Sequence, residues 1–141
     1  MKIFFLVLTN CLSFFAYNSR AQNIVVKNIE ELRAANQSAK PGNIVILKNG
    51  EWNNINIRLN CSGTKEKPIL FKAETAGKVI LTGKSSLKLG GNYITVDGLY
   101  FTKGYAGDNA VIDFRIDKKQ LANFCRVTNT VINDFNNPQR K

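Results

Sequence analysis

The residues that could do acid–base or metal chemistry are few and lie mostly in the second half of the chain. After Asp97 the carboxylates are Asp108, Asp113, Asp117 and Asp134. Their spacing does not match a calcium loop of the EF-hand type, so we predict scattered loop acids and no metal site. The sequence has no His and no pair of Cys at ligand spacing, which excludes a zinc site. The residue pattern therefore identifies no catalytic group.

The charge balance is basic and favours an anionic partner. Twenty Lys and Arg stand against ten Asp and Glu, a net charge of +10 in 141 residues. Removal of residues 1–21 takes away Lys2 and Arg20, which leaves 18 against 10, or +8. Long-range attraction then favours a polyanion. No nucleic-acid-binding motif is present, so we expect an acidic polysaccharide and no nucleic acid. The alternative is that the Lys residues are solvent-facing filler on exposed strand edges.

Short strands must position these charges. Between residues 63 and 101 the chain holds four short apolar runs bounded by Gly, Pro, Asn or Ser, which is typical of strands and leaves no room for a helix. One series of runs begins at equal intervals, at Ile44, Ile69 and Ile94. A second, interleaved series has Ile55 and Val79 at nearly the same interval. Two series with one period favour a β-solenoid. A β-sandwich is the alternative.

The rest of the chain predicts a few further elements. A first strand covers Ile24–Val26, and a helix follows over residues 29–39 with Asn28 as its cap. We expect this helix to cover the open end of the solenoid, since a terminal coil otherwise exposes its core and edge. A strand is predicted over residues 110–116, and one or two more over residues 124–135.

Several motifs carry a resemblance to a known family. Lys40 to Leu47, followed by Gly50-Glu51-Trp52, looks like the opening of parallel β-helix proteins of the pectate-lyase type, with Asn43 and Trp52 where Asp and Tyr are usual. Further motifs follow in order: Gly63-Thr64, Lys67-Pro68-Ile69, Lys72-Ala73-Glu74, Gly77-Lys78-Val79, Thr82-Gly83-Lys84-Ser85, Gly98-Leu99-Tyr100-Phe101, and Cys125-Arg126-Val127 to Phe135-Asn136-Asn137-Pro138. From about Asn23 to the last residue the chain resembles the N-terminal part of polysaccharide lyase family 6, the chondroitinase B-like and alginate lyases.

The resemblance implies an all-β fold: a right-handed, single-stranded parallel β-helix with an N-terminal capping helix, truncated at its C-terminal end. Residues 1–21 have a positive start, an apolar stretch and small residues before the end, so we predict a secretory signal peptide. Residues 22–141 then form the first coils of an incomplete lyase domain. The protein is expected to be secreted or periplasmic, with no membrane contact after signal cleavage.

In the resembled family, catalysis is a β-elimination at a uronic acid. Calcium held by Asn and Glu side chains neutralises the substrate carboxylate, a Lys removes the adjacent proton and an Arg assists. The family's catalytic and calcium-binding residues lie in later coils, so none is transferred to this chain. We therefore expect an N-terminal fragment of a lyase for alginate or a chondroitin- or dermatan-type polysaccharide that is inactive alone. A binding module that holds acidic polysaccharide without cleaving it, and a truncated product without a function of its own, are the alternatives.

The substrate-binding candidates are basic residues in the coils closest to where the family's groove would begin: Lys103, Arg115, Lys118, Lys119 and Arg126. Solvated surface charge is the alternative for each. Cys61 and Cys125 are expected to be buried small hydrophobes, although a disulfide is permitted outside the cytoplasm. An uncapped C-terminal coil predicts marginal stability or self-association. The sequence does not separate alginate from sulfated substrates, or endo from exo cleavage.

Overall fold

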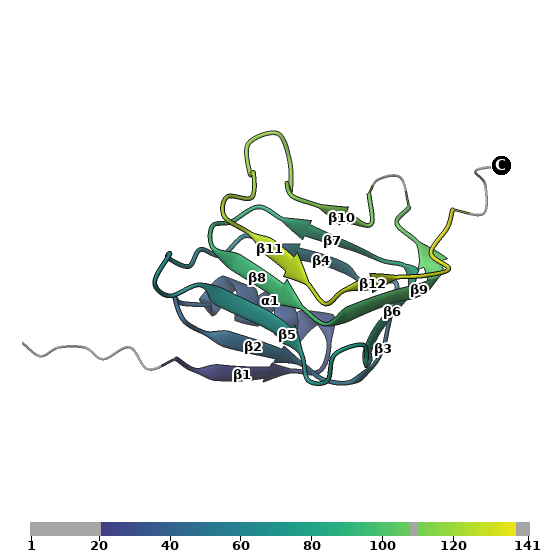
Figure 1. Cartoon of the computed structure of the whole chain (residues 1–141), viewed down its shortest axis with the longest axis horizontal. Coiled ribbons are helices and arrows are strands. Elements are labelled where there is room, and N and C mark those ends of the chain that lie inside the picture. Colours follow the sequence, from purple (N-terminus) through teal and green to yellow (C-terminus); the bar gives the residue numbers. More distant parts are fainter. Residues whose placement is uncertain (1–20, 108–109, 138–141) are drawn as a thin grey trace, which may run out of the picture.

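The chain winds into a column of stacked coils whose walls are parallel β-sheets (Figure 1). The structure is a computed structural model, and it describes residues 21–107 and 110–137. The predicted signal peptide therefore lies, apart from its last residue, outside the described residues, and so does Asp108. The α-helix found in the described residues has ten residues, and no helix there is long and apolar enough to cross a membrane.

The described strands form three walls, which we call sheets A, B and C. Sheet A has the order β1 (Asn23–Val26), β2 (Ile44–Leu47), β5 (Ile69–Ala73), β8 (Ile94–Asp97) and β11 (Arg126–Thr128). Sheet B has the order β3 (Gly50–Asn53), β6 (Val79–Lys84), β9 (Leu99–Tyr105) and β12 (Val131–Ile132). Sheet C has the order β4 (Asn56–Leu59), β7 (Ser86–Leu89) and β10 (Ile112–Asp113).

The first coil runs from β1 into a helix, whereas each later coil passes from sheet A to sheet B, and the coils that begin with β2, β5 and β8 continue to sheet C. All pairs of these named strands are parallel, for example Ile44 with Leu70 and Ile69 with Ile94. A strand therefore pairs with the strand of the next coil and not with its neighbour in sequence. This arrangement confirms the predicted parallel β-helix and excludes the β-sandwich, which needs antiparallel sheets packed face to face.

The prediction of two strand series with one period was wrong in its second series. The register partner of Val79 is Gly50, on the strand before Ile55. The repeat also varies: it is short between Val79 and Leu99 and much longer between Thr95 and Arg126. The reason is that loops of different length leave the column at its corners, which shifts the spacing without changing the stacking. A third series, in sheet C, was not recognised.

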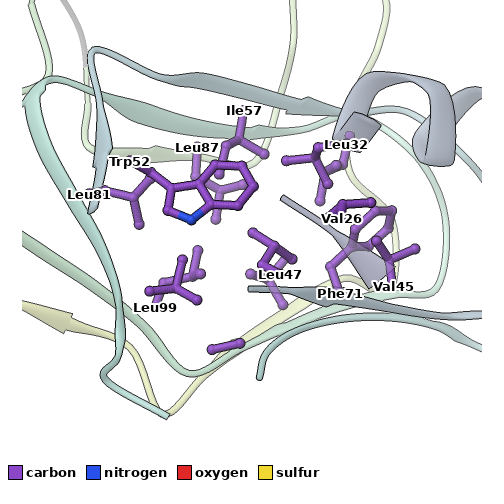
Figure 2. Close-up of a cluster of buried hydrophobic side chains, with 14 of the residues drawn as sticks. Val26, Leu32, Val45, Leu47, Trp52, Ile57, Phe71, Leu81, Leu87 and Leu99 are labelled. Carbon is purple, nitrogen blue, oxygen red and sulfur yellow. The ribbon is translucent and has the colours of Figure 1, made fainter. Parts of the chain in front are cut away.

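The interior of the column is filled by the inward-facing side chains of all three sheets (Figure 2). Strand residues alternate between the two faces of a sheet, so each strand gives every second residue to the core. Phe71 and Phe101 are fully buried, and Trp52 lies over the same core with its indole N–H donating to the carbonyl of Lys48 at 3.1 Å. The continuous apolar interior holds the coils together, since each coil buries its face against the next.

The helix α1 (Ile29–Ser38) forms where a helix was predicted and ends one residue earlier than expected. Its cap is confirmed: the Asn28 side chain accepts a hydrogen bond from the Glu31 N–H at 2.8 Å. The Glu31 carboxylate in turn accepts from the Lys27 N–H at 2.8 Å, which completes a reciprocal cap. Leu32 and Ala35 are buried against the column. The helix stands in the first coil where the later coils have a strand of sheet C (Figure 1).

The strand predicted over residues 110–116 is only partly formed. Strand β10 covers Ile112–Asp113, after which the chain folds back on itself. The Ile116 N–H donates to the carbonyl of Gln120 at 2.9 Å, and Arg115 and Leu121 form an antiparallel bridge. The predicted strand was too long because it was based on the alternation of apolar residues, and one of these, Phe114, faces solvent. The two strands β11 and β12 confirm the prediction for the last segment.

Candidate functional site

The outer wall of sheet C carries a row of charged residues in register, two positive and one negative. Arg58 on β4 pairs with Lys88 on β7, and Lys88 pairs with Asp113 on β10. Their strand neighbours Ile57 and Leu87 are buried in the core. The alternation of a strand therefore directs Arg58 and Lys88 to the outer face.

A short loop after β10 adds more charge to the same wall. The Arg115 side chain lies 3.5 Å from the Asp113 carboxylate. The Asp117 side chain accepts hydrogen bonds from the N–H groups of Lys119 at 2.8 Å and Gln120 at 2.9 Å. These two bonds hold the pKa of Asp117 below its ordinary value, and the positive charge of Arg58 lowers it further. The loop that carries Asp117 therefore lies near Arg58 of sheet C.

We call the outer residues of sheet C and this loop the basic face: Arg58, Lys88, Arg115, Lys118 and Lys119. Except for the half-buried Lys88, these residues are exposed. An array of cations in neighbouring coils suits a ligand that is itself a repeating anion, because carboxylates spaced along a chain can meet several of them at once. Arginine adds a planar fork that fits a carboxylate with two hydrogen bonds.

The structure brings together three of the five predicted substrate-binding residues. Arg115, Lys118 and Lys119 belong to the loop of the basic face. Lys103 lies on β9 in sheet B, and Arg126 is the first residue of β11 in sheet A, so both stand on other walls of the column. All five are exposed.

Sequence reasoning missed Arg58 and Lys88. The signal that could have found them is a pattern shared by two strands, each with a Lys or Arg between two buried apolar residues. Ile57 and Leu59 flank the first, and Leu87 and Leu89 flank the second. Recognition of sheet C as a third series would have placed both residues on one face.

The acidic, Cys and His side chains of the described residues are not clustered. No group of three or more Asp, Glu, Cys or His in residues 21–107 and 110–137 is placed to hold an ion. Asp113 and Asp117, two of the predicted loop acids, instead contact Arg115 and backbone N–H groups. The resemblance implies calcium, but the described residues contain no group of three or more acidic, Cys or His side chains that could bind it. We derive no chemical step that involves calcium.

The cysteines of the described part are free thiols set at one corner of the column. Burial raises the pKa of Cys61 to about 12 and that of Cys125 in the same direction. The Cys125 thiol donates to the carbonyl of Gly91 at 3.3 Å. A thiol with a raised pKa is a poor nucleophile, so these residues act as small half-buried side chains.

The stacked parallel coils define a β-helix protein, and a charged outer wall of this kind is suited to a polyanionic chain. Residues 26–141 match the family model described as Chondroitinase B, and the chain belongs to this family. No curated protein matches the chain.

Solved structures of polysaccharide lyase family 6 resemble the chain in sequence and fold. The alginate lyase AlyGC is 42% identical with a TM-score of 0.80, over 82% of this chain and 16% of that one. A family 6 polysaccharide lyase from Pseudopedobacter saltans is 39% identical with a TM-score of 0.75, over 82% and 26%. A mannuronic-acid-specific family 6 lyase from human gut microbiota is 33% identical with a TM-score of 0.74, over 85% and 28%. The chain thus spans between 16% and 28% of the length of these lyases.

Proposed function

We propose that this chain forms the first coils of a secreted or periplasmic polysaccharide lyase and that its basic face holds the acidic polysaccharide. The observation that carries the proposal is the register of Arg58 with Lys88 on the outer wall of a column that belongs to a lyase family. The substrate class is a uronic-acid polymer, alginate or a chondroitin- or dermatan-type chain. The similar structures include an alginate lyase and a mannuronic-acid-specific lyase, which favours alginate.

The geometry explains how a polyuronate would be held. Neighbouring strands of a sheet lie about 4.8 Å apart, so Arg58 and Lys88 offer two cations in a row across the coils. The nearby Arg115, Lys118 and Lys119 widen this row along the loop. Cations beside a uronate carboxylate also stabilise the charge that develops when the neighbouring C–H loses its proton, which is the demanding step of a β-elimination.

We further propose that the isolated chain binds polysaccharide without cleaving it. The described residues provide no cluster of metal-binding acids. The resemblance implies that the family's base and calcium ligands lie in later coils. Calcium remains a proposal for the longer protein. A binding module without catalysis is the second candidate function, and it rests on the same basic face.

Two measurements test these proposals. On an alginate column, the chain should be retained at low salt and released as salt screens the charges. The double variant Arg58→Ala/Lys88→Ala should elute earlier than Lys40→Ala/Lys78→Ala, which removes the same charge from exposed positions elsewhere. Equal elution of the two variants would contradict the assignment of the basic face.

The second measurement follows the ultraviolet absorbance of unsaturated uronate with alginate and with dermatan sulfate, in the presence of calcium. We expect no product from the chain alone. Accumulation of product would show that the chain carries its own catalytic groups. It would also show which substrate class is cleaved.

Two further proposals concern the helix and the strand β12. We infer that α1 caps the column, since Leu32 and Ala35 close over the core next to β1, β2 and β4. On β12, Val131 and Ile132 are about half exposed, and we expect association of two copies through this strand. A sedimentation coefficient that does not change with protein concentration would contradict the association.

A further inference from the structure

A depression of about 460 Å³ lies on the outer face of sheet B, on a different wall from the basic face. Its size falls within the range of about 300–1,000 Å³ that is usual for small-molecule sites. Two columns of side chains cross it in register from strand to strand. One is Glu51, Ile80 and Tyr100, and the other begins with Asn53 and Thr82. Figure 1 shows the strands β3, β6 and β9 that carry them side by side.

One wall of the depression is a fixed chain of polar groups. The Asn53 amide donates to the Thr82 hydroxyl at 2.9 Å, and this hydroxyl donates to the Glu51 carboxylate at 2.7 Å. The side-chain oxygen of Asn53 also accepts a hydrogen bond from the side-chain amide of Asn54 at 2.7 Å. Such a chain orients each group before a ligand arrives, which lowers the entropy lost on binding.

The other wall is aromatic and cationic. The Tyr100 hydroxyl is held by the side chains of Asn133, at 3.4 Å, and of Thr102, and these bonds lower its pKa. The exposed Lys103 stands beside it on β9. Tyr100 thus offers both a ring face and a hydroxyl to a ligand.

An irregularity of the sheet places Lys103 at the depression. Leu81 pairs with Phe101, but Gly83 pairs with Gly104, so β9 has one residue more than β6 between these pairs. This is a β-bulge, a feature that redirects side chains and often lies next to functional sites. Lys103 itself has a positive φ of 50°, an unfavourable conformation for a residue with a side chain.

Two glycines allow the close approach of the backbone at the bulge, and one of them, Gly83, lines the depression. A Cβ on Gly104 would overlap the carbonyl oxygen of Gly83. A Cβ on Gly83 would collide with the Asn54 side chain, and Gly83 has a φ of +63°. The sheet therefore has no side chain to fill the space next to Thr82 and Lys103.

We propose that this depression is a second carbohydrate-binding site, which takes a short stretch of an acidic sugar chain with Lys103 on a carboxylate. Tyr100 packs against the C–H face of a sugar ring, and Glu51 accepts hydrogen bonds from ring hydroxyls. Because strands lie about 4.8 Å apart, β3 and β9 are about 10 Å apart, so the carboxylate of Glu51 and the ammonium of Lys103 contact different parts of the sugar. The choice of a uronate over a neutral sugar rests on the proposed function.

The site is tested by following the backbone amide signals of the full chain by NMR during titration with trimannuronate. We expect shifts at Thr82, Gly83 and Lys103. Tyr100→Ala should weaken this binding about tenfold, the loss expected when one good contact is removed. The matched control Tyr105→Ala removes a ring from the same strand outside the depression and should bind as the parent does. If Tyr100→Ala fails to fold, Lys103→Ala tests the site by its contact with the carboxylate and should also weaken binding.

The outcomes separate this site from the basic face. Shifts at the depression that persist in Arg58→Ala/Lys88→Ala support a separate site. Shifts at sheet C alone, or no shifts at all, overturn it. Shifts at the depression alone would keep the second site and contradict the basic face. Equal binding of the neutral trisaccharide maltotriose would overturn the role of Lys103 on a carboxylate.

Discussion

Arg58 on β4 and Lys88 on β7 are register partners, so two positive charges lie side by side on the outer face of sheet C. Like charges directly opposite each other on a sheet repel, typically by about 0.2–1 kcal/mol. Asp113, opposite Lys88, and Asp117, which lies near Arg58, offset part of this repulsion. The interaction between Arg58 and Lys88 can therefore be measured as a coupling in the free energy of unfolding, without any ligand.

A double-mutant cycle should measure this repulsion. With Arg58→Gln, Lys88→Gln and the double variant, we expect an unfavourable coupling of about 0.2–1 kcal/mol in the free energy of unfolding at low salt. The coupling should fade at high salt, because salt screens exposed charges. Urea unfolding at two ionic strengths measures both. A coupling near zero would show that the two side chains diverge, and a favourable coupling would contradict the repulsion.

A carboxylate joins the last two described coils. Asp97 accepts hydrogen bonds from the Thr128 hydroxyl at 2.7 Å and the Asn129 amide at 2.6 Å. We expect Asp97→Ala to lower the free energy of unfolding by about 1–3 kcal/mol, because both donors lose their partner. Asp97→Asn keeps one acceptor oxygen and should lose less. Equal losses in the two variants, measured by urea unfolding, would contradict this role of the side chain.

Glu74 gives the fold a pH dependence through Lys48. A hydrogen bond from Lys48 and another from the Asn49 N–H, at 3.1 Å, lower the pKa of Glu74 below its ordinary value of 4.5. A carboxylate whose pKa is lowered by folding stabilises the protein above its unfolded pKa, and this contribution is lost as pH falls through the folded pKa. We therefore expect Glu74→Gln to be less stable than the parent at neutral pH.

The difference between the two proteins should persist down to about pH 4.5 and disappear below it. Thermal unfolding of both proteins across the acid range measures it. A matched change of an exposed acid in α1, Glu30→Gln, serves as the control. A constant difference at all pH values would show that Glu74 acts through packing and not through its charge.

The sequence predicted the parts of the fold that local chemistry determines. The cap Asn28 and the strand Ile44–Leu47 follow from side-chain hydrogen bonding and apolar pattern, and both were found as predicted. The pairing of Gly50 with Val79 could not be predicted, because glycine carries no apolar signal and the loops between coils differ in length.

The candidate site was harder to predict for the same reason. Lys118 and Lys119 stand out as neighbours in sequence, but Arg58 and Lys88 become neighbours only through the stacking of coils. Lys103 was noticed for its charge, whereas its place in a β-bulge depends on a register shift between β6 and β9. Properties that depend on register are invisible until the partners of each strand are known.

A close approach of successive coils at Gly91 gives the most severe prediction. A Cβ on this buried glycine would overlap the backbone carbonyl oxygen of Cys61 and lie 2.9 Å from the side chain of Ile94. Backbone cannot move aside as a side chain can, so Gly91→Ala must separate two coils or distort the corner. We expect a loss of at least about 3 kcal/mol in the free energy of unfolding, the upper end for overpacked cores.

Gly77→Ala is the matched control, because it tests conformation without crowding. Gly77 has a φ of +75° and open space where its Cβ would stand. Its substitution should cost about 1–2 kcal/mol, the penalty of a left-handed conformation for a residue with a Cβ. Urea unfolding of both variants compares the two costs. Equal stability of Gly91→Ala and Gly77→Ala would contradict the close approach of the two coils at Gly91 and Cys61.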